Sequence, residues 1–233
     1  MGRRTGILES GRVLYEKNPD ERVPIASITK LMTLLLTFEA IHGGKLTLDT
    51  LVPVSEHAYH MGGSQIWLKE GEQMRVEDLI KAVCVVSGND AAVALGEHLA
   101  GSEEAFVARM NERAKELGCV DSHFVNPNGL PNEDHYTSAY DLAMIGKAFF
   151  ANEALCKMTM THMLHILPSE RQPDDIMEVN KMELIPGGKY AYPYLVGCKT
   201  GYTDVARSTL VSCAEKDGMK LICVVMRDEN PNY

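Results

Sequence analysis

Three short segments of the sequence carry side chains that together could perform nucleophilic catalysis. They read Ser27-Ile28-Thr29-Lys30, Ser87-Gly88-Asn89 and Lys199-Thr200-Gly201. A serine hydroxyl is a weak nucleophile and needs a base within hydrogen-bonding distance. Ser27 and Lys30 are three positions apart, so in a helix their side chains face the same way. We therefore expect Lys30 to accept the proton of Ser27.

A lysine can act as a base only when it is neutral, and the other two motifs suit that requirement. Burial and a nearby second cation both lower a lysine pKa, and Lys199 could be that cation. Ser87 and Asn89 offer a hydroxyl and an amide that can relay a proton and hold a substrate carbonyl. Lys199, with the hydroxyls of Thr200 and Thr203, can hold a substrate carboxylate.

Two further features would assist attack by Ser27. A serine in the first turn of a helix lies beside unpaired backbone N–H groups and the positive end of the helix dipole, which suit a developing oxyanion. Gly201 has no side chain where an extended substrate would lie beside its strand. Each motif alone has an ordinary explanation, for example Ser27 as a helix N-cap or Lys199 as an edge-strand charge. The prediction therefore depends on all three motifs together.

The surrounding sequence predicts the elements that position these motifs. Apolar residues at helical spacing predict one helix over about 31–41 and another over about 76–86. A third is expected from residue 90, after the break at Ser87-Gly88-Asn89. Short β-prone runs around Ser10-Gly11 predict a hairpin.

Three more β-prone runs lie at 196–200, 207–214 and 219–227. They have apolar residues at both odd and even positions, as in strands covered on both faces. We predict an α/β (α+β) fold, with an antiparallel sheet built from both chain ends, flanking helices and a mostly helical insertion. Residues 1–233 would form a single catalytic domain. Its sheet part would cover about 1–50 and 190–233, and its helical part about 51–189.

The composition excludes several classes of protein. The chain has 233 residues, 45% of them hydrophobic, which excludes a disordered chain. No apolar run reaches the roughly 18 residues that span a bilayer. The net charge of −9 argues against nucleic-acid binding, because phosphate backbones are recognised through positive charge. We expect no metal and no cofactor, because the eight histidines show no convincing ligand spacing.

The cysteines and the tryptophan have ordinary structural interpretations. The six cysteines form no C-x-x-C pair, and most of them lie among apolar residues, which favours buried thiols. Spacing alone does not exclude a disulfide between neighbouring strands. Trp67 is the only tryptophan, and we expect it to pack in the core.

The motif set and its surroundings closely resemble the D-alanyl-D-alanine carboxypeptidases, the low-molecular-mass penicillin-binding proteins. The resemblance covers most of the chain and implies a β-lactamase/penicillin-binding-protein-like fold. Besides the three motifs, it runs through Gly11-Arg12-Val13-Leu14-Tyr15-Glu16-Lys17-Asn18, Gly62-Gly63-Ser64-Gln65, Met110-Asn111-Glu112-Arg113-Ala114, Asn126-Pro127-Asn128-Gly129-Leu130 and Lys199-Thr200-Gly201-Tyr202-Thr203.

The resemblance implies a role for each motif. Ser27 would be the acylated nucleophile and Lys30 its base, while Ser87 and Asn89 would complete the proton relay and position the peptide. Lys199 and Thr200 would bind the terminal carboxylate, and the N–H groups of Ser27 and Tyr202 would form the oxyanion hole. The substrate would be the peptidoglycan stem pentapeptide, and β-lactams would acylate Ser27. The location would be extracytoplasmic, at the cell wall, periplasm or membrane.

The sequence departs from the family pattern at its ends. We expect no signal or anchor in this chain, and we expect the usual C-terminal helix and β-rich domain to be absent. Apolar residues of the last two predicted strands would then be partly bare, which predicts a trimmed catalytic domain or self-association through that sheet face. Arg227 could help to bind the substrate carboxylate.

Three alternatives stay open. A class A β-lactamase shares the motif set but uses an added glutamate, for which Glu178 and Glu183 are candidates. A transpeptidase or endopeptidase could use the same site, because the sequence does not define the acyl acceptor. The chain could also be a non-catalytic binder of peptidoglycan or penicillin.

Overall fold

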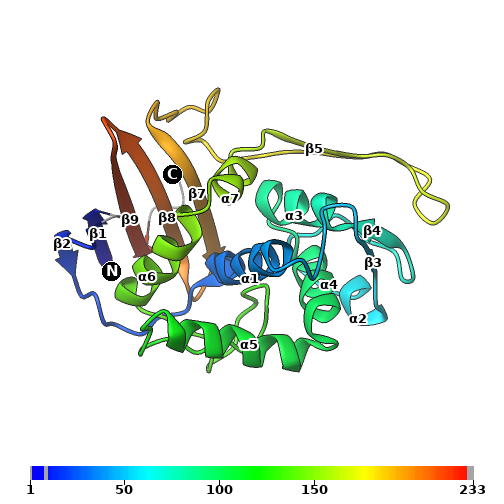
Figure 1. The fold of residues 1–233 in the computed structure, drawn as a ribbon, viewed down its shortest axis with the longest axis horizontal. Helices are drawn as coiled ribbons and strands as arrows, with labels where there is room; N and C mark the ends of the chain where they lie inside the picture. The colour runs from blue at the N-terminus through cyan, green and yellow to red at the C-terminus, as the bar shows by residue number, and fades with distance from the viewer. Residues whose placement is uncertain (1, 8–9, 230–233) are drawn as a thin grey trace.

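The computed structural model describes residues 2–7 and 10–229, which form a sheet and a group of helices (Figure 1). The strands of the main sheet are β1 (Arg3–Ile7), β2 (Val13–Lys17), β7 (Leu195–Thr203), β8 (Arg207–Lys216) and β9 (Met219–Asp228). Their order is β2-β1-β9-β8-β7, and every neighbouring pair is antiparallel. Both ends of the chain therefore contribute to one antiparallel sheet, which confirms the predicted fold class.

The middle of the chain is mainly helical. Its helices are η1 (Ala26–Thr29, a 3₁₀ helix), α1 (Lys30–His42), α2 (Glu56–Tyr59), α3 (Val76–Val85), α4 (Asn89–Ala100), α5 (Glu103–Glu116), α6 (Ala139–Phe150) and α7 (Glu153–Thr159). Two short ribbons accompany them, β3 (Leu51–Pro53) with β4 (Gln73–Arg75), and β5 (Met163–Ile166) with β6 (Ile176–Val179). The β5–β6 ribbon extends past α3 as a long arm (Figure 1). The single-domain division at residues 51 and 189 stays a prediction.

The predicted hairpin, the β8–β9 turn and two helix starts have local causes. β1 and β2 pair around Ser10-Gly11, although residues 8 and 9 lie outside the described part of the chain. Gly218, at φ +76°, makes the tight turn between β8 and β9. The hydroxyls of Ser102 and Ser138 accept hydrogen bonds from the first turns of α5 and α6, and such caps satisfy otherwise unpaired N–H groups.

Helix α1 lies at the centre of the helical part. It contacts α3, α4, α5, α6 and α7, and nearly all of its side chains are buried. A helix that is buried on every side must satisfy its polar groups internally. The hydroxyl of Thr33 accordingly donates to the Pro127 carbonyl at 2.6 Å, and that of Thr37 donates to the Thr33 carbonyl at 2.8 Å. Lys30, the first residue of this helix, is therefore buried in the interior of the protein.

The two faces of the main sheet are covered unequally. Helix α6 packs on one face, where the buried side chains of β9 are Ile222, Val224 and Met226. The alternate residues Leu221, Cys223 and Val225 are only half-buried, so equal cover of both faces, as expected from the apolar runs, is not observed. Self-association through this face stays a prediction.

Other expectations have mixed outcomes. All six cysteines are free thiols, and only Cys223 is not fully buried, as expected. Trp67 is 63% exposed, so its expected place in the core is wrong; its backbone at φ +62° turns the ring away from the interior. Among the described residues, no helix combines the length and hydropathy that a membrane crossing requires.

Gly146 sets how closely α6 approaches the sheet. A Cβ there would lie 3.4 Å from the nearest side-chain atom of Val211, in ordinary contact. We expect Gly146→Leu to push α6 from β8 and β9 and to lower the free energy of unfolding by about 1–3 kcal/mol. Gly146→Ala should be neutral or stabilising by up to about 1 kcal/mol, because alanine favours helices. Urea unfolding measures both, and equal stability of the two variants would contradict this packing.

Candidate active site

Ser27 lies in the 3₁₀ helix η1 and Lys30 begins α1, so one continuous turn presents both side chains. Residues three apart nearly eclipse in a 3₁₀ helix, and the Lys30 Nζ lies 2.9 Å from the Ser27 Oγ. Ala26, just before the serine, has φ +49°, a conformation that is uncommon for residues other than glycine. Ser27 and Lys30 therefore face each other as their spacing predicts, on a tighter helix than expected, and their roles as nucleophile and base stay a prediction.

The Lys30 Nζ has two other partners, and neither can donate a proton. These are the Asn89 Oδ1 at 2.7 Å and the Asn128 carbonyl oxygen at 2.6 Å. A neutral amine has two hydrogens and one lone pair. Donation to these two oxygens uses both hydrogens, which leaves the lone pair to accept the Ser27 hydroxyl proton. The surroundings of Lys30 therefore match an uncharged base.

Electrostatics favour the same state of Lys30. Its side chain is completely buried, and burial holds its pKa well below the ordinary value; the charge of Lys199 adds to this effect. Asp90 acts in the opposite direction and raises the pKa. Removing an ammonium from water disfavours the charged form. The expectation that burial and a second cation lower the pKa of Lys30 therefore agrees with the structure.

Asn89 is oriented by a second contact. Its Nδ2 donates to the Gly62 carbonyl at 2.7 Å, which directs Oδ1 to Lys30. Asn89 is 4% exposed and is not among the residues that border the main pocket. The structure therefore places this amide behind the base rather than beside a bound ligand.

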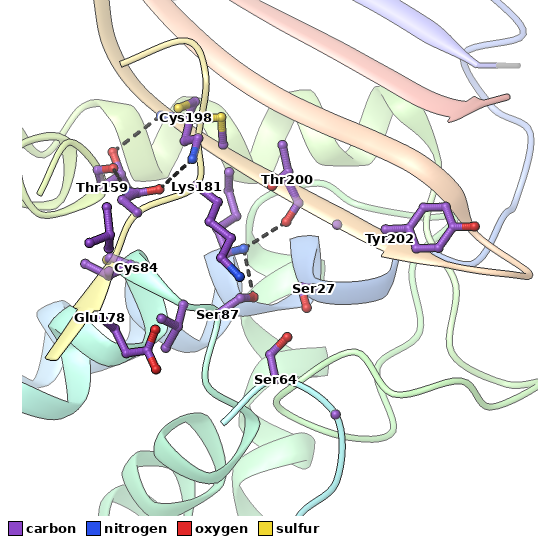
Figure 2. Close-up of a pocket in the computed structure, with 18 of the residues that line it drawn as sticks. Ser27, Ser64, Cys84, Ser87, Thr159, Glu178, Lys181, Cys198, Thr200 and Tyr202 are labelled. Atoms are coloured by element: carbon purple, nitrogen blue, oxygen red, sulfur yellow. Dashed lines mark hydrogen bonds between the residues drawn. The ribbon is translucent and has the colours of Figure 1, made fainter. Parts of the chain in front are cut away.

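Ser87 and Lys199 meet across the pocket. The Lys199 Nζ donates to the Ser87 Oγ at 2.9 Å and to the Thr200 carbonyl at 2.8 Å, as drawn in Figure 2. Burial lowers the pKa of Lys199 to about 8, so at pH 7 it is mainly charged. Ser87 joins α3 to α4 with φ +62°, and this turn directs its hydroxyl toward β7.

Gly201 has a role that the sequence did not indicate. A Cβ at this position would lie 2.8 Å from the Thr209 Oγ1, 2.9 Å from the Ile25 carbonyl and 3.0 Å from the Ile28 nitrogen. The space beside Gly201 is therefore filled by residues 25–29, the turn that presents Ser27 and is called the nucleophile turn below. The glycine lets that turn approach β7 closely.

The remaining predicted residues lie at different depths. Thr200 and Tyr202 border the pocket, but the Tyr202 ring points away from Ser27 and its hydroxyl donates to Asp204 at 3.3 Å (Figure 2). The Thr203 Oγ1 accepts the Ala206 N–H at 3.1 Å and thus stabilises the β7–β8 turn. Thr203 does not border the pocket, because this turn holds its side chain.

Ser27, Ser87 and Lys199 border one cavity of about 640 Å³. Its walls come from residues 63–65 and Trp67, from the end of β6 and the residues that follow it, and from β7 (Figure 2). Glu178 borders this cavity, whereas Glu183 does not. Arg227 pairs with Glu21 and borders a separate cavity, so the structure does not bring it to the cavity that contains Ser27.

A buried histidine behind the nucleophile turn was not predicted. The Thr29 Oγ1 donates to the Ala26 carbonyl at 2.8 Å and lies 2.6 Å from the His135 Nε2. The His135 Nδ1 accepts the Val125 N–H at 3.1 Å. These partners fix a neutral imidazole with its hydrogen on Nε2, and burial lowers the pKa of His135 to about 4. His135 supports the strained residue that precedes Ser27.

The turn at 126–130 also supports Lys30 and the residue before Ser27. The Asn126 Oδ1 accepts the N–H groups of Asn128 and Gly129, and this places the Asn128 carbonyl on Lys30. Gly129, at φ +90°, packs directly on the Ala26 carbonyl. The cluster of asparagine, proline and glycine in the sequence predicts a turn here, but it does not predict the contacts of this turn with Lys30 and Ala26.

These groups make the site suitable for acyl transfer. A serine with a neutral amine beside it can attack a carbonyl, and a charged lysine on the neighbouring strand can hold an anionic group. Among the described residues, no group of three or more His, Cys, Asp or Glu side chains is arranged to hold a metal ion.

Comparisons with known proteins agree with this chemistry. The sequence profile of the family described as D-alanyl-D-alanine carboxypeptidase (peptidase S11) matches residues 8–230. D-alanyl-D-alanine carboxypeptidase DacF of Bacillus subtilis is 44% identical over 223 residues, which cover 96% of this chain and 56% of that protein. The chain spans about half the length of the curated relatives that it matches.

Solved structures with a similar fold come from proteins with related names. The D-alanyl-D-alanine carboxypeptidase DacD from Francisella tularensis has a TM-score of 0.89 and 29% identity, with 98% of this chain and 66% of that chain covered. Penicillin-binding protein D2 from Listeria monocytogenes, in its ampicillin-bound form, has a TM-score of 0.83 and 26% identity, with 99% and 90% covered.

Gly129 offers a test of the nucleophile turn. A Cβ at this position would lie 1.9 Å from the Ala26 carbonyl oxygen. We expect Gly129→Ala to abolish acylation of Ser27 by a β-lactam and to destabilise the fold. Gly118→Ala is the matched control, because Gly118 has a similar φ of +82° but no neighbouring atom within 4 Å. The control should lose about 1 kcal/mol and retain acylation. Retained acylation in Gly129→Ala would show that the close approach of Gly129 to Ala26 is not needed to position Ser27.

The buried His135 predicts a pH dependence of stability. Its pKa is lowered from 6.5 to about 4 in the folded protein, so the unfolded chain binds this proton more readily. The buried neutral imidazole therefore contributes fully to the free energy of unfolding above pH 6.5, and this contribution is lost as the pH falls toward 4. Between pH 7 and 4 the protein should lose on the order of 3 kcal/mol more than a His135→Gln variant. Denaturant unfolding at each pH measures this, and parallel curves for the two proteins would contradict it.

Proposed function

Since the chain belongs to the D-alanyl-D-alanine carboxypeptidase family, we propose that it is a serine-type carboxypeptidase that removes the terminal D-Ala from peptidoglycan stem pentapeptides. One observation carries the proposal. The buried Lys30 Nζ lies 2.9 Å from the Ser27 Oγ, and its other two partners are oxygens that only accept. This arrangement makes the serine a nucleophile without a metal or a histidine.

Acylation begins with proton transfer from the Ser27 hydroxyl to Lys30. The serine oxygen attacks the carbonyl carbon of the penultimate D-Ala, and the N–H groups of Ser27 and Tyr202 stabilise the resulting oxyanion. Because the Ser87 Oγ accepts a hydrogen bond from Lys199, its own hydrogen is free to reach the leaving nitrogen. Lys30 then returns a proton through Ser87, and D-Ala departs as an amine.

Deacylation repeats these steps with water. Lys30 accepts a proton from the water, hydroxide attacks the ester, and Ser27 recovers its proton when the ester bond breaks. The terminal carboxylate of the substrate is held by the charged Lys199 and by Thr200, both of which border the pocket. A β-lactam enters the same pathway, but its leaving nitrogen remains attached to the acyl group and the ester is long-lived.

The substrate implies a location and limits the partners. Peptidoglycan lies outside the cytoplasmic membrane, so we propose an extracytoplasmic site of action. The proposed ligands are the stem peptide and β-lactam antibiotics. The negative net charge supports the view that nucleic acid is not a partner.

A penicillin should form a long-lived covalent adduct on Ser27. An intact-mass time course, followed by peptide mapping, measures the adduct, and released D-Ala measures turnover of a pentapeptide. Ser27→Ala should form no adduct, and Lys30→Met should acylate at least about 100-fold more slowly. Rapid hydrolysis of the drug would instead indicate a β-lactamase. Peptide binding without an adduct or turnover would indicate a non-catalytic binder.

The state of Lys199 predicts the alkaline limit of the reaction. Catalysis needs Lys30 neutral and Lys199 charged, and the pKa of Lys199 is about 8. The value of kcat/KM for D-Ala release should therefore fall above a pH of about 8. In Lys199→Arg the guanidinium remains charged, so the residual activity should persist to higher pH. An unchanged alkaline limit in this variant would assign the fall to another group.

A further inference from the structure

Three tyrosines occupy alternate positions in the segment that leads into β7. Tyr190, Tyr192 and Tyr194 are 46%, 48% and 38% exposed. Within the described part of the chain, none of their hydroxyls has a hydrogen-bond partner in the protein. A tyrosine combines an apolar ring with a polar tip, and such side chains are enriched where proteins bind other molecules. The three side chains are therefore candidates for a binding surface.

The backbone that carries these tyrosines is held in place. The N–H groups of Tyr190 and Tyr192 donate to the carbonyls of residues 183–184, each at 3.0 Å, and the Tyr194 carbonyl accepts an N–H of β8 at 2.8 Å. Ile185 is 2% exposed and anchors the segment in a small apolar cluster with residues of β7 and β8. Exposed rings on a fixed backbone are arranged before a ligand arrives, which lowers the entropic cost of binding.

The rings also contact one another and two cations. The rings of Tyr192 and Tyr194 meet edge to face, with their centroids 5.7 Å apart. The Lys189 Nζ lies 4.8 Å from the centroid of the Tyr190 ring. The Lys216 Nζ lies 4.9 Å from that of Tyr194. These contacts orient the rings and place polar groups beside them.

A cavity of about 420 Å³ lies beside Tyr194, a size that is ordinary for small-ligand sites. Its walls include Glu215, Lys216 and Asp217, from the end of β8 and the turn to β9. Glu215 pairs with Lys220 at 3.5 Å. No ion pair to the Asp217 carboxylate is found among the described residues. This carboxylate can accept hydrogen bonds from a ligand.

The chemistry of this surface fits a neutral sugar chain. The charges of Lys189 and Lys216 balance those of Glu215 and Asp217, so the surface favours no charged ligand. The C–H face of a sugar ring can pack on an aromatic ring, while its hydroxyl and amide groups can bond to phenol hydroxyls and carboxylates. An anionic membrane is disfavoured, because the chain has a net charge of −9.

The surface is separate from the candidate active site. The three tyrosines do not border its cavity, and Figure 1 shows the start of β7 at the end of the sheet far from α1. A strand rises about 3.3 Å per residue, so Leu195 and Gly201 lie about 20 Å apart. The proposed substrate has its terminal carboxylate at Lys199 and its reacting carbonyl at the Tyr202 N–H, so the rest of the peptide extends away from Tyr194.

We propose that Tyr190, Tyr192 and Tyr194 form a binding surface for a glycan strand of peptidoglycan, apart from the site for the stem peptide. This inference rests on the proposed function, because peptidoglycan joins stem peptides to strands of β-1,4-linked N-acetylhexosamines. The strand bound here is a neighbour of the one that carries the reacting peptide. Binding it would raise the local concentration of stem peptides at Ser27.

A soluble neutral glycan tests this surface directly. The probe is chitohexaose, a chain of six N-acetylglucosamines, and NMR titration of the isotope-labelled protein measures its binding. The protein should bind it saturably, and Tyr192→Ala and Tyr194→Ala should each weaken binding at least about fivefold. Tyr15→Ala, which removes an exposed tyrosine on β2, is the matched control and should bind as the protein does. No saturable binding, or equal binding by all variants, would overturn the surface.

Turnover separates this surface from the active site. With isolated peptidoglycan, the variant that combines Tyr192→Ala with Tyr194→Ala should release D-Ala at least about fivefold more slowly than the protein. With a soluble pentapeptide, its kcat/KM should change less than about twofold. Equal losses on both substrates would overturn the surface. Binding to phosphatidylglycerol vesicles without binding to chitohexaose would assign the tyrosines to a membrane and also overturn it.

The two proposals can fail separately. A penicillin adduct on Ser27 and turnover of the soluble pentapeptide, without chitohexaose binding, would leave the carboxypeptidase proposal intact and overturn the glycan surface. Saturable chitohexaose binding that the tyrosine variants lose, with no adduct and no turnover, would support the surface and overturn the enzyme.

Discussion

The burial of an uncharged amine is the constraint on which the site depends. A lysine ammonium is costly to remove from water unless it is paired, and Lys30 has no carboxylate among its hydrogen-bond partners. The side chain is tolerated because it can give up its proton and because Asn89 and Asn128 accept its hydrogens. These two partners come from the start of α4 and from a distant turn, so the base works only when three segments of chain meet around α1.

Close backbone approach is the second requirement, and glycines provide it. The nucleophile turn lies between β7 and the 126–130 turn. Gly201 and Gly129 are the points of contact, where a Cβ would overlap the backbone of the nucleophile turn. The hydroxyl of Thr209 joins this arrangement by donating to the Gly201 carbonyl at 2.9 Å. The sheet therefore serves as the rigid support against which Ser27 is held.

Sequence reasoning predicted the elements and the chemical groups, but not their orientation. Helical spacing, caps and the three motifs are local signals, so α1, α3, α4 and the pair of Ser27 and Lys30 could be predicted. The direction of a polar side chain depends on partners far away in the chain. Asn89 is directed away from the pocket by the Gly62 carbonyl, and Trp67 is held at the border of the pocket because Asp90 accepts the N–H groups of its two neighbours, Ile66 and Leu68. Neither partner lies within helical spacing of the residue that it orients.

Asn89 and Asp90 link the base to the pocket wall through two adjacent residues. Asp90 fixes the segment that displays Trp67, but its charge also raises the pKa of Lys30. Burial and Lys199 act against it, and burial is the larger effect. A buried carboxylate near the base is therefore tolerated because it is already engaged by backbone N–H groups, which stabilise its charge locally. The rigidity of the wall and the neutrality of the base are thus set at the same helix end, and a change at either residue would affect both.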